Sequence, residues 1–195
     1  MNILLINGAQ SLFGEGGQLN THLHQLAVRH LSECGHAVQE THIEAGYDMA
    51  AEVDKFIWAE AIVFQMAGWW MGLPWKVKQY MDEVYSIGHG RIYASDGRSH
   101  LNPEVNYGTG GLLQGRQYML STTWNAPLHA FTAPEEFFEG KGVDGVYFAF
   151  HKAQQFVGLQ ALPTFMLNDV VKDNQPEAFA AAYRHHLTQV FGSAH

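Results

Sequence analysis

The sequence predicts an α/β protein in which parallel strands alternate with helices. Three observations lead to this fold class. Short, continuously apolar runs, typical of buried parallel strands, recur along the 195-residue chain. The segments between them carry apolar residues at helical spacing. No change of composition and no repeat divides the chain, so we expect residues 1–195 to form a single domain.

The first half of the chain supplies three strands. The run ILLING at residues 3–8 predicts the first, HAVQETHI at 36–43 the second and AIVFQM at 61–66 the third. Apolar spacing predicts helices over residues 19–34, over 50–58 and from Pro74 onwards, where a proline suits a first helical turn.

The second half completes the sheet. QYMLSTTW at 117–124 predicts a fourth strand, ALPTFML at 161–167 a fifth, and Pro176 opens a last helix. Right-handed crossovers join such strands into one parallel sheet. Five of them fit the flavodoxin-like order 2-1-3-4-5, a three-layer sandwich with helices on both faces. Residues 86–116 and 125–145 lack periodicity, and loops of this length are uncommon unless they serve a function.

Composition excludes several classes of protein. The net charge is −8 and the basic residues are scattered, so nucleic acid is not an expected partner. No apolar run approaches the ~18 residues of a membrane span, so membrane insertion is not expected either. The single cysteine, Cys34, excludes an internal disulfide and favours a reducing, cytoplasmic location. Its place at the end of a helical apolar stripe predicts a core residue rather than a nucleophile.

The twelve histidines do not show a metal-binding spacing. Neither HxxxH nor HExxH occurs, and one cysteine cannot build a thiolate site. His22 and His24 are two apart in a predicted helix and would point to different faces. We therefore expect no bound metal.

Three segments follow predicted strands at the edge where ligands of open parallel sheets bind. NGAQSLFGEGGQLN at 7–20 is glycine-rich and opens a helix, as a phosphate site requires. AGWWMGLPW at 67–75 and TTWNAP at 122–127 supply tryptophans for a flat apolar wall, with Trp75 expected in the core. A bare turn and ordinary core aromatics remain open as alternatives for the segments taken singly. Together they predict a nucleotide or flavin site.

No acid–base pair stands out in the sequence. Asp82 and Glu83 lie on a predicted helix, where we expect them to be solvated. A flavin would account for this, because hydride transfer through its N5 atom depends on positioning more than on side-chain chemistry.

The chain resembles the modulator of drug activity B family of flavodoxin-like NAD(P)H:quinone oxidoreductases. The resemblance runs nearly end to end and is most specific in QMAGWWMGLPWKVKQYMDEV at 65–84. It also rests on GQLN at 17–20, GHGRIYASDGR at 88–98, YGTGGLLQG at 107–115, TWNAP at 123–127, GVDGVYFAFHKAQQF at 142–156 and LPTF at 162–165. It implies FAD as cofactor, NADPH or NADH as co-substrate, a homodimer, and two-electron reduction of quinones to hydroquinones in a ping-pong cycle through flavin N5.

The resemblance also implies which residues form the site. The pyrophosphate would lie at the start of the first helix, against Gly16, Gly17, Gln18, Leu19 and Asn20. The isoalloxazine would lie between two groups, namely Gly68, Trp69, Trp70 and Met71 on one side and Thr123, Trp124, Asn125 and Ala126 on the other. Tyr107 matches a flavin-site tyrosine, with two roles open: hydrogen bonding to the quinone oxygen as a catalytic residue, or packing on the flavin.

Two positions depart from the family pattern. Ala67 replaces a proline that often precedes the Gly-Trp-Trp run. Glu15 replaces a small hydroxyl residue in the phosphate loop, where a carboxylate would repel a pyrophosphate by ~1 kcal/mol or more. Three other functions stay open: a flavin-dependent azo or nitro reductase, a flavodoxin-like regulatory subunit of a transport system, and an electron-carrier flavodoxin.

Overall fold

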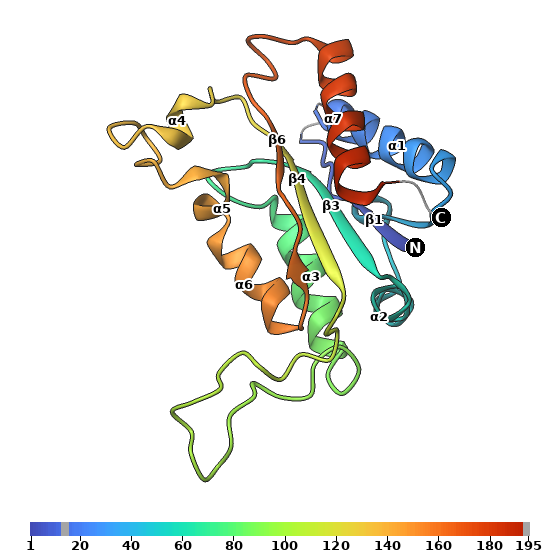
Figure 1. Ribbon diagram of the computed structural model, residues 1–195, viewed down its shortest axis with the longest axis vertical. Coiled ribbons are helices and arrows are strands. Elements are labelled where there is room, and N and C mark those ends of the chain that lie inside the picture. The colour runs from blue at the N-terminus through green and yellow to red at the C-terminus, as the bar shows by residue number, and fades with distance from the viewer. Residues whose placement is uncertain (13–15, 193–195) are drawn as a thin grey trace.

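The protein is a three-layer α/β sandwich with a parallel sheet at its centre (Figure 1). The computed structural model describes residues 1–12 and 16–192. The strand order is β2-β1-β3-β4-β5, and a further strand, β6, also pairs with β4. The predicted fold class and the order 2-1-3-4-5 are confirmed.

Four strands form the main part of the sheet. β1 (Asn2–Asn7) pairs with β2 (Ala37–His42) and with β3 (Ala61–Ala67), and β3 pairs with β4 (Gln117–Thr123). β1, β3 and β4 are almost entirely buried, because helices cover both of their faces. This explains why they read as continuous apolar runs.

The predicted fifth strand is divided into two short ones. β5 (Gln160–Ala161) and β6 (Phe165–Leu167) pair with opposite ends of β4. Pro163 lies between them, and a proline has no N–H to give to a ladder. The interruption therefore follows from one residue within the predicted run.

The helices cover the two faces of the sheet in groups. α1 (Gln18–Glu33) and α7 (Pro176–Phe191) pack on the face that carries Ile3, Leu5 and Val63. α2 (Met49–Trp58), α3 (Trp75–Ile87) and α6 (Phe148–Phe156) cover the other face. No helix in the described part of the chain is both long and apolar enough to span a membrane.

The two aperiodic segments differ from each other. Residues 125–145 contain α4 (His129–Thr132) and the start of α5 (Gly142–Val146), whereas residues 88–116 form one long loop without a helix. A short 3-10 turn, η1 (Ile43–Ala45), follows β2. The sequence did not predict α6, whose many aromatic residues obscure a helical stripe.

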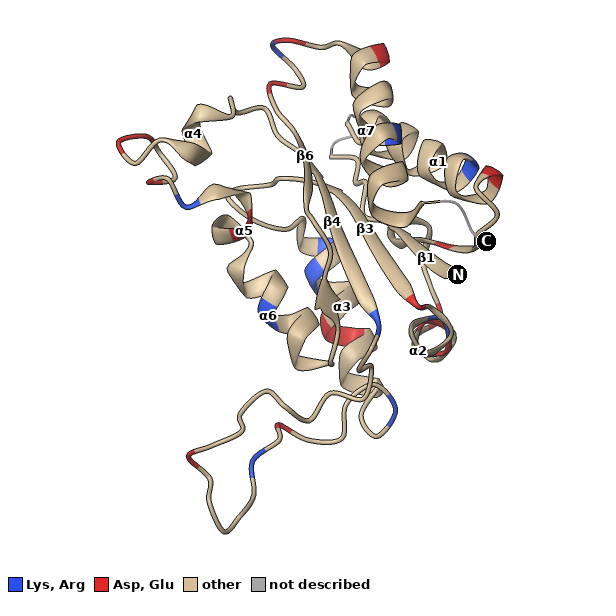
Figure 2. Cartoon of the chain, viewed as in Figure 1, with Lys and Arg blue, Asp and Glu red and all other residues tan. Residues whose placement is uncertain are grey.

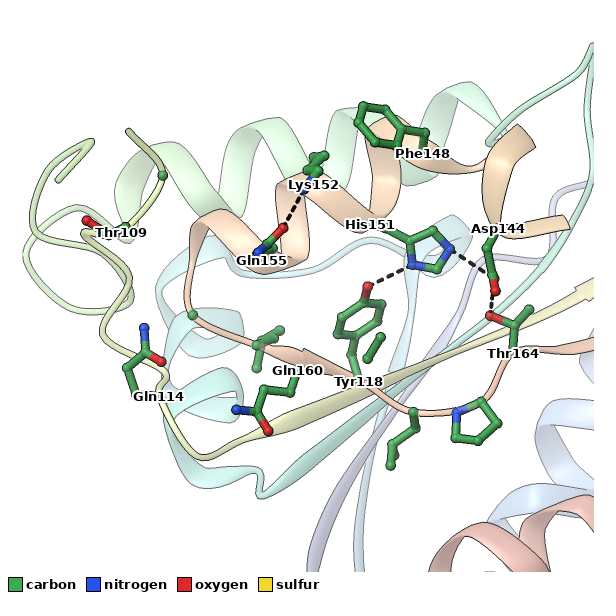
Figure 3. A pocket seen from close by; sticks show the side chains of 16 residues that line it. Thr109, Gln114, Tyr118, Asp144, Phe148, His151, Lys152, Gln155, Gln160 and Thr164 are labelled. Carbon is green, nitrogen blue, oxygen red and sulfur yellow. Dashed lines mark hydrogen bonds and ion pairs between the residues drawn. The ribbon is translucent and has the colours of Figure 1, made fainter. Parts of the chain in front are cut away.

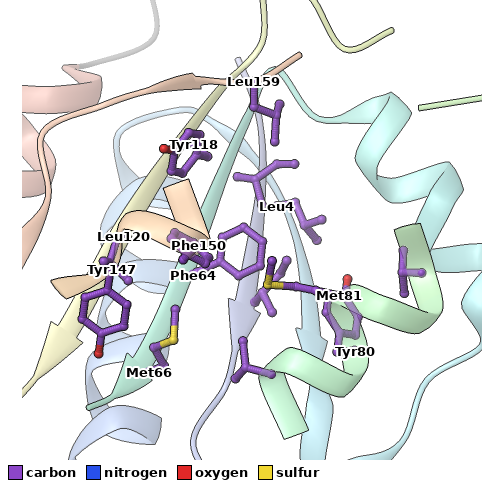
Figure 4. Close-up of a cluster of buried hydrophobic side chains, with 14 of the residues drawn as sticks. Leu4, Phe64, Met66, Tyr80, Met81, Tyr118, Leu120, Tyr147, Phe150 and Leu159 are labelled. Carbon is purple, nitrogen blue, oxygen red and sulfur yellow. The ribbon is translucent and has the colours of Figure 1, made fainter. Parts of the chain in front are cut away.

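The larger half of the core lies between the sheet and α3 and α6 (Figure 4). Phe64 of β3 meets Phe150 of α6 edge to face, with ring centroids 5.2 Å apart. Tyr80 and Met81 point inward from α3. Trp75, expected in the core, is instead 56% exposed. It lies two residues before the buried stripe of α3 begins at Val77, so it faces away from the sheet.

Two further residues can be compared with expectation. Cys34, expected in the core, is only half-buried and forms the C-cap of α1. Asp82 is exposed, as expected, and pairs with Lys78 on the surface of α3. Lys, Arg, Asp and Glu are spread over many elements without a basic stripe in the described chain (Figure 2).

Candidate functional site

The carboxyl ends of β1, β3 and β4 bring the three predicted segments to one edge of the sheet. The Gly8 N–H donates to the carbonyl of Gln65 at 2.8 Å, joining the segment after β1 to β3. The Gly68 N–H donates to the carbonyl of Thr123 at 2.9 Å, joining the segment after β3 to the end of β4. The backbone itself therefore fixes the relative positions of the three segments.

A buried chain of side-chain hydrogen bonds also ties α1 to this edge. Ser121 Oγ donates to Gln65 Oε1 at 2.7 Å, and Gln65 Nε2 donates to Asn20 Oδ1 at 2.8 Å. Asn20 Nδ2 then donates to Thr123 Oγ1 at 2.9 Å. All four residues are buried. The side chain of Asn20 is thus used to hold the first turn of α1 against β3 and β4.

The N-terminus of α1 is open to a ligand. Gly17 is its N-cap with φ 82°, and a Cβ there would lie 3.2 Å from the Gln10 carbonyl oxygen, so glycine is needed. No side chain of the described residues caps the helix, and its first turn holds no acidic residue. The N–H groups of that turn lack intrahelical acceptors and border a cavity of about 270 Å³. Glu15 lies outside the described residues.

A carboxylate that the sequence did not single out, Glu44, borders the same cavity. The Ser11 N–H donates to its two oxygens at 3.1 and 3.2 Å, the Ser11 hydroxyl to one of them at 3.1 Å, and Lys76 Nζ lies 3.2 Å away. Partial burial raises the pKa of Glu44, but these hydrogen bonds outweigh it and leave the pKa below its usual value. The Glu44 carboxylate therefore links the loop after β1, through Ser11, to α3, through Lys76. Both partners are remote from Glu44 in the sequence.

The tryptophan segment forms a strained two-residue turn. Trp69 and Gly72 exchange backbone hydrogen bonds of 3.0 and 2.9 Å, which closes a tight hairpin. Its central residues, Trp70 and Met71, have φ values of 41° and 63°, a geometry that normally selects Asn-Gly. Left-handed backbone costs an L-residue about 1–2 kcal/mol. Because Trp70 is also 94% exposed, burial in this chain does not offset that cost. Backbone strain of this kind is concentrated at functional sites, which makes the turn a candidate for ligand contact.

Trp124 has a different environment from Trp70. Its indole is buried and meets Phe131, Phe138 and Tyr147 edge to face. A Cβ on Gly68 would lie 2.1 Å from this indole, so the Gly68 backbone rests directly on the ring. The side chain of Trp124 therefore supports the turn from below, and Trp70 is the ring presented to solvent.

The rest of the segment after β4 is anchored by its backbone. The carbonyl of Ala126 accepts hydrogen bonds from Asn168 Nδ2 at 3.0 Å and from the Asp169 N–H at 3.3 Å. Asn125 is exposed beside it. Its amide is thus available to a ligand on a loop that is held in place.

Tyr107 does not join these residues within one chain. It lies in the loop of residues 88–116, which projects from the end of the molecule opposite α4 (Figure 1). Its ring is 71% exposed and lies 5.9 Å from that of Phe156 and 5.5 Å from the Arg98 guanidinium.

A larger cavity of about 720 Å³ lies along α6 and β5 (Figure 3). Tyr118 Oη and His151 Nδ1 are 2.7 Å apart, and His151 Nε2 lies 3.2 Å from Asp144 Oδ1, which also accepts from Thr164 Oγ1 at 2.6 Å. His151 lowers the pKa of Asp144, and burial raises the pKa of Tyr118 to about 12. No acid–base pair stands out in the sequence because these residues lie 26 to 46 positions from Tyr118, and only the fold brings them together.

Comparison with known proteins agrees with the fold. The chain matches the flavodoxin-like fold family over residues 1–190. NADPH:quinone oxidoreductase MdaB of Haemophilus influenzae is 55% identical over 192 residues, which cover 98% of this chain and 100% of that protein.

Two solved structures share the fold. A Klebsiella pneumoniae protein provisionally assigned as a quinone reductase has a TM-score of 0.78 at 23% identity, covering 99% of this chain and 86% of its own. General stress protein 14 of Treponema denticola, solved with FMN, has a TM-score of 0.67 at 21% identity, covering 96% and 97%. Family match and full-length identity together show that the chain belongs to the flavodoxin-like family and, within it, to the modulator of drug activity B family.

Proposed function

We propose that this protein is an FAD-dependent NADPH:quinone oxidoreductase that reduces quinones to hydroquinones in a ping-pong cycle. The observation that carries the proposal is Trp70, a strained and almost fully exposed aromatic ring at the same sheet edge as the uncapped N-terminus of α1. The name of the 55% identical relative, an NADPH:quinone oxidoreductase, supports both the reaction and the reductant. The free thiol of Cys34 supports a cytoplasmic location.

The phosphate end of the site suits a dinucleotide. Gly16 and Gly17, both at positive φ, leave room for a pyrophosphate beside the N–H groups of Gln18, Leu19 and Asn20. The positive end of the α1 dipole favours these anions. A second cavity of about 330 Å³, which shares Ala9, Thr21 and Glu44 with the first, provides space for an adenosine beyond the phosphates. This supports FAD over FMN.

The aromatic end of the site suits an isoalloxazine. Trp70 offers a flat face, Trp69 is half-buried beside it, and Gly68 lets the backbone approach the ring closely. Met71 and the segment from Thr123 to Ala126 would border the remaining sides. When bound, the flavin supplies an N5 atom that accepts hydride from NADPH and returns it to a quinone. Nicotinamide and quinone are both flat, so the same open face can receive them in turn.

Tyr107 supports a homodimer. It lies at the far end of its own sheet, so its hydroxyl can reach a flavin site only in a second copy of the chain. Leu101 of the same loop is 98% exposed, and Phe137 and Phe148 are more than half exposed. Contact with a second copy of the chain would bury such apolar side chains. We propose that the Tyr107 hydroxyl donates a hydrogen bond to the quinone oxygen in the partner's site.

Steady-state kinetics tests the reaction and the role of Tyr107 together. Initial rates at varied NADPH and menadione should give parallel double-reciprocal lines, as expected when one product leaves before the second substrate binds. Tyr107→Phe should raise the menadione KM or lower kcat without changing the dimer seen by light scattering. Intersecting lines would contradict the ping-pong cycle. Unchanged quinone kinetics in the variant would leave Tyr107 with packing alone, and a fully active monomer would contradict the dimer.

A further inference from the structure

A second cluster of functional side chains lies on the α1 side of the sheet, next to the cavity proposed for the adenosine. His24 comes from α1, whereas Glu40 and His42 are two residues apart on the edge strand β2 and so share the face that α1 covers. Glu40 Oε2 lies 2.9 Å from His24 Nε2 and 3.2 Å from His42 Nε2. The three ligand-type atoms all lie within 4.8 Å of one another.

We propose that His24, Glu40 and His42 form a binding site for a divalent transition metal such as Zn²⁺. Two imidazole nitrogens and one carboxylate oxygen are a frequent ligand set for this ion. Bonds of about 2.0–2.1 Å in a tetrahedron separate the ligand atoms by roughly 3.3 Å, close to the 2.9 and 3.2 Å found here. The two imidazole nitrogens lie within 4.8 Å of each other, so a bound metal would draw the exposed His42 ring toward His24.

Burial and access at the cluster also suit a metal. The His24 side chain is 0% exposed, which fixes one ligand, whereas those of Glu40 and His42 are 40% and 44% exposed and leave an entry path. His42 borders the cavity of about 330 Å³ described above, so a fourth ligand position would open into that cavity, beside the proposed adenosine. The pattern that predicts such a site is Glu-x-His on a strand combined with a histidine on the covering helix. Helical spacings such as HxxxH do not indicate this pattern, because its three residues come from two different elements.

The hydrogen bonds around His42 indicate which ring nitrogen carries the proton, and therefore which proton a metal at Nε2 would displace. Asn7 Oδ1 accepts from the Ala9 N–H at 2.9 Å, which leaves Asn7 Nδ2 to donate to His42 Nδ1 at 3.2 Å. In the metal-free state the proton of a neutral His42 ring is therefore on Nε2, facing Glu40. We assign the same tautomer to His24, because its Nε2 lies 2.9 Å from the Glu40 carboxylate, which can only accept. A metal at Nε2 moves that proton to Nδ1, so neither ring gains or loses a proton overall.

This shift affects the two histidines differently. His24 Nδ1 is buried without a hydrogen-bond partner among the described residues, so the change creates no new unpaired atom there. At His42 the new Nδ1–H would face the amide N–H of Asn7, which opposes metal binding. An aspartate at position 7 would accept from both the Ala9 N–H and His42. Asn7→Asp should therefore tighten the site.

The structural consequence is a cross-link between α1 and the edge of the sheet. β2 is an edge strand, and α1 begins at the uncapped N-terminus described above. A metal joining His24 to Glu40 and His42 would restrain α1 against β2, whereas the buried Asn20 chain holds α1 against β3 and β4. It would therefore raise the stability of the folded protein.

Zinc titration of the tag-free, chelator-stripped holoprotein tests the site, with a chromophoric chelator as competitor. We expect one Zn²⁺ per chain, and His42→Gln or Glu40→Gln should weaken binding at least about ten-fold, the loss typical of disturbed metal sites. His185→Gln, an exposed histidine on α7, is the matched control and should bind as the wild type does. Equal zinc affinity in wild type and His42→Gln would overturn the proposal, because the ion would then be held by other surface histidines.

Two further readouts separate the site from a folding defect. X-ray absorption at the zinc edge should report two imidazole nitrogens and oxygen at about 2.0–2.2 Å. Asn7→Asp should increase the zinc affinity, a gain that a misfolded variant cannot produce. Absence of the imidazole signal, or of any gain in Asn7→Asp, would contradict the assigned ligands.

Discussion

Replacing Trp70 by glycine should stabilise the flavin-free protein while weakening the flavin site. Trp70 holds φ at 41°, and relief of left-handed strain is worth about 1–2 kcal/mol. Glycine at position 70 also gives the unfolded chain more conformational freedom, which offsets about 0.4–1 kcal/mol of that gain in stability. Little packing is lost, because the ring is 94% exposed. The expected net gain is about 0.5–1 kcal/mol, or ~1–4 °C in Tm for a chain of this length.

The same change should remove one face of the proposed isoalloxazine site. An aromatic pair contributes ~0.5–1.5 kcal/mol beyond the area it buries. With the lost burial included, we expect FAD to bind about ten-fold more weakly or worse. Urea denaturation of the flavin-free protein and a fluorescence titration with FAD measure the two effects separately.

Trp124→Ala is the matched contrast for this experiment. Its ring is buried against Phe131, Phe138 and Tyr147, so its truncation should cost about 3–5 kcal/mol. If Trp70→Gly destabilised the flavin-free protein to a similar extent, Trp70 would be a packing residue. The functional reading of the strained turn would then be refuted.

Three other changes probe the supports of the site. Gly68→Ala places a Cβ 2.1 Å from the indole of Trp124 and should cost about 1–3 kcal/mol in urea denaturation, together with loss of bound flavin. Asn20→Ala leaves a buried amide donor of Gln65 unpaired and should cost about 1–3 kcal/mol by the same assay; a smaller loss would mean that water replaces the amide. Asp144→Asn should lower Tm at pH 7. The folded-state pKa of Asp144 is lowered, so its contribution to stability is fully present above the unfolded pKa of about 4. The difference from wild type should shrink as the pH falls below that value and vanish once the pH is below the lower folded-state pKa.

The main strands and the first helix could be predicted because local sequence determines them. β1, β3 and β4 are buried on both faces and therefore appear as unbroken apolar runs. The three segments of the site could be predicted for the same reason, since the carboxyl ends of parallel strands meet at one edge. Gly17 and Gly68 account for the remaining backbone geometry of the site. Gly17 adopts a positive φ and the backbone of Gly68 lies against the Trp124 ring, and residues with a Cβ are excluded from both arrangements.

Side-chain direction and long-range assembly could not be predicted. Trp70, Trp75 and Trp124 are identical in type, and only the turn, the start of a helix and the end of a strand decide which one is buried. The His24 cluster and the Tyr118 cluster each combine residues from separate elements, so no local spacing indicates them. The role proposed for Tyr107 would require contact with a second copy of the chain.

An anaerobic absorption titration of the purified protein tests the central claim most directly. The proposal predicts a two-banded flavin spectrum with one FAD per chain, which NADPH bleaches and menadione then restores. Protein that stays colourless after addition of FAD or FMN would contradict a flavin at the carboxyl edge of the sheet. Flavin that NADPH bleaches but menadione does not restore would retain the cofactor and reject the quinone as its acceptor.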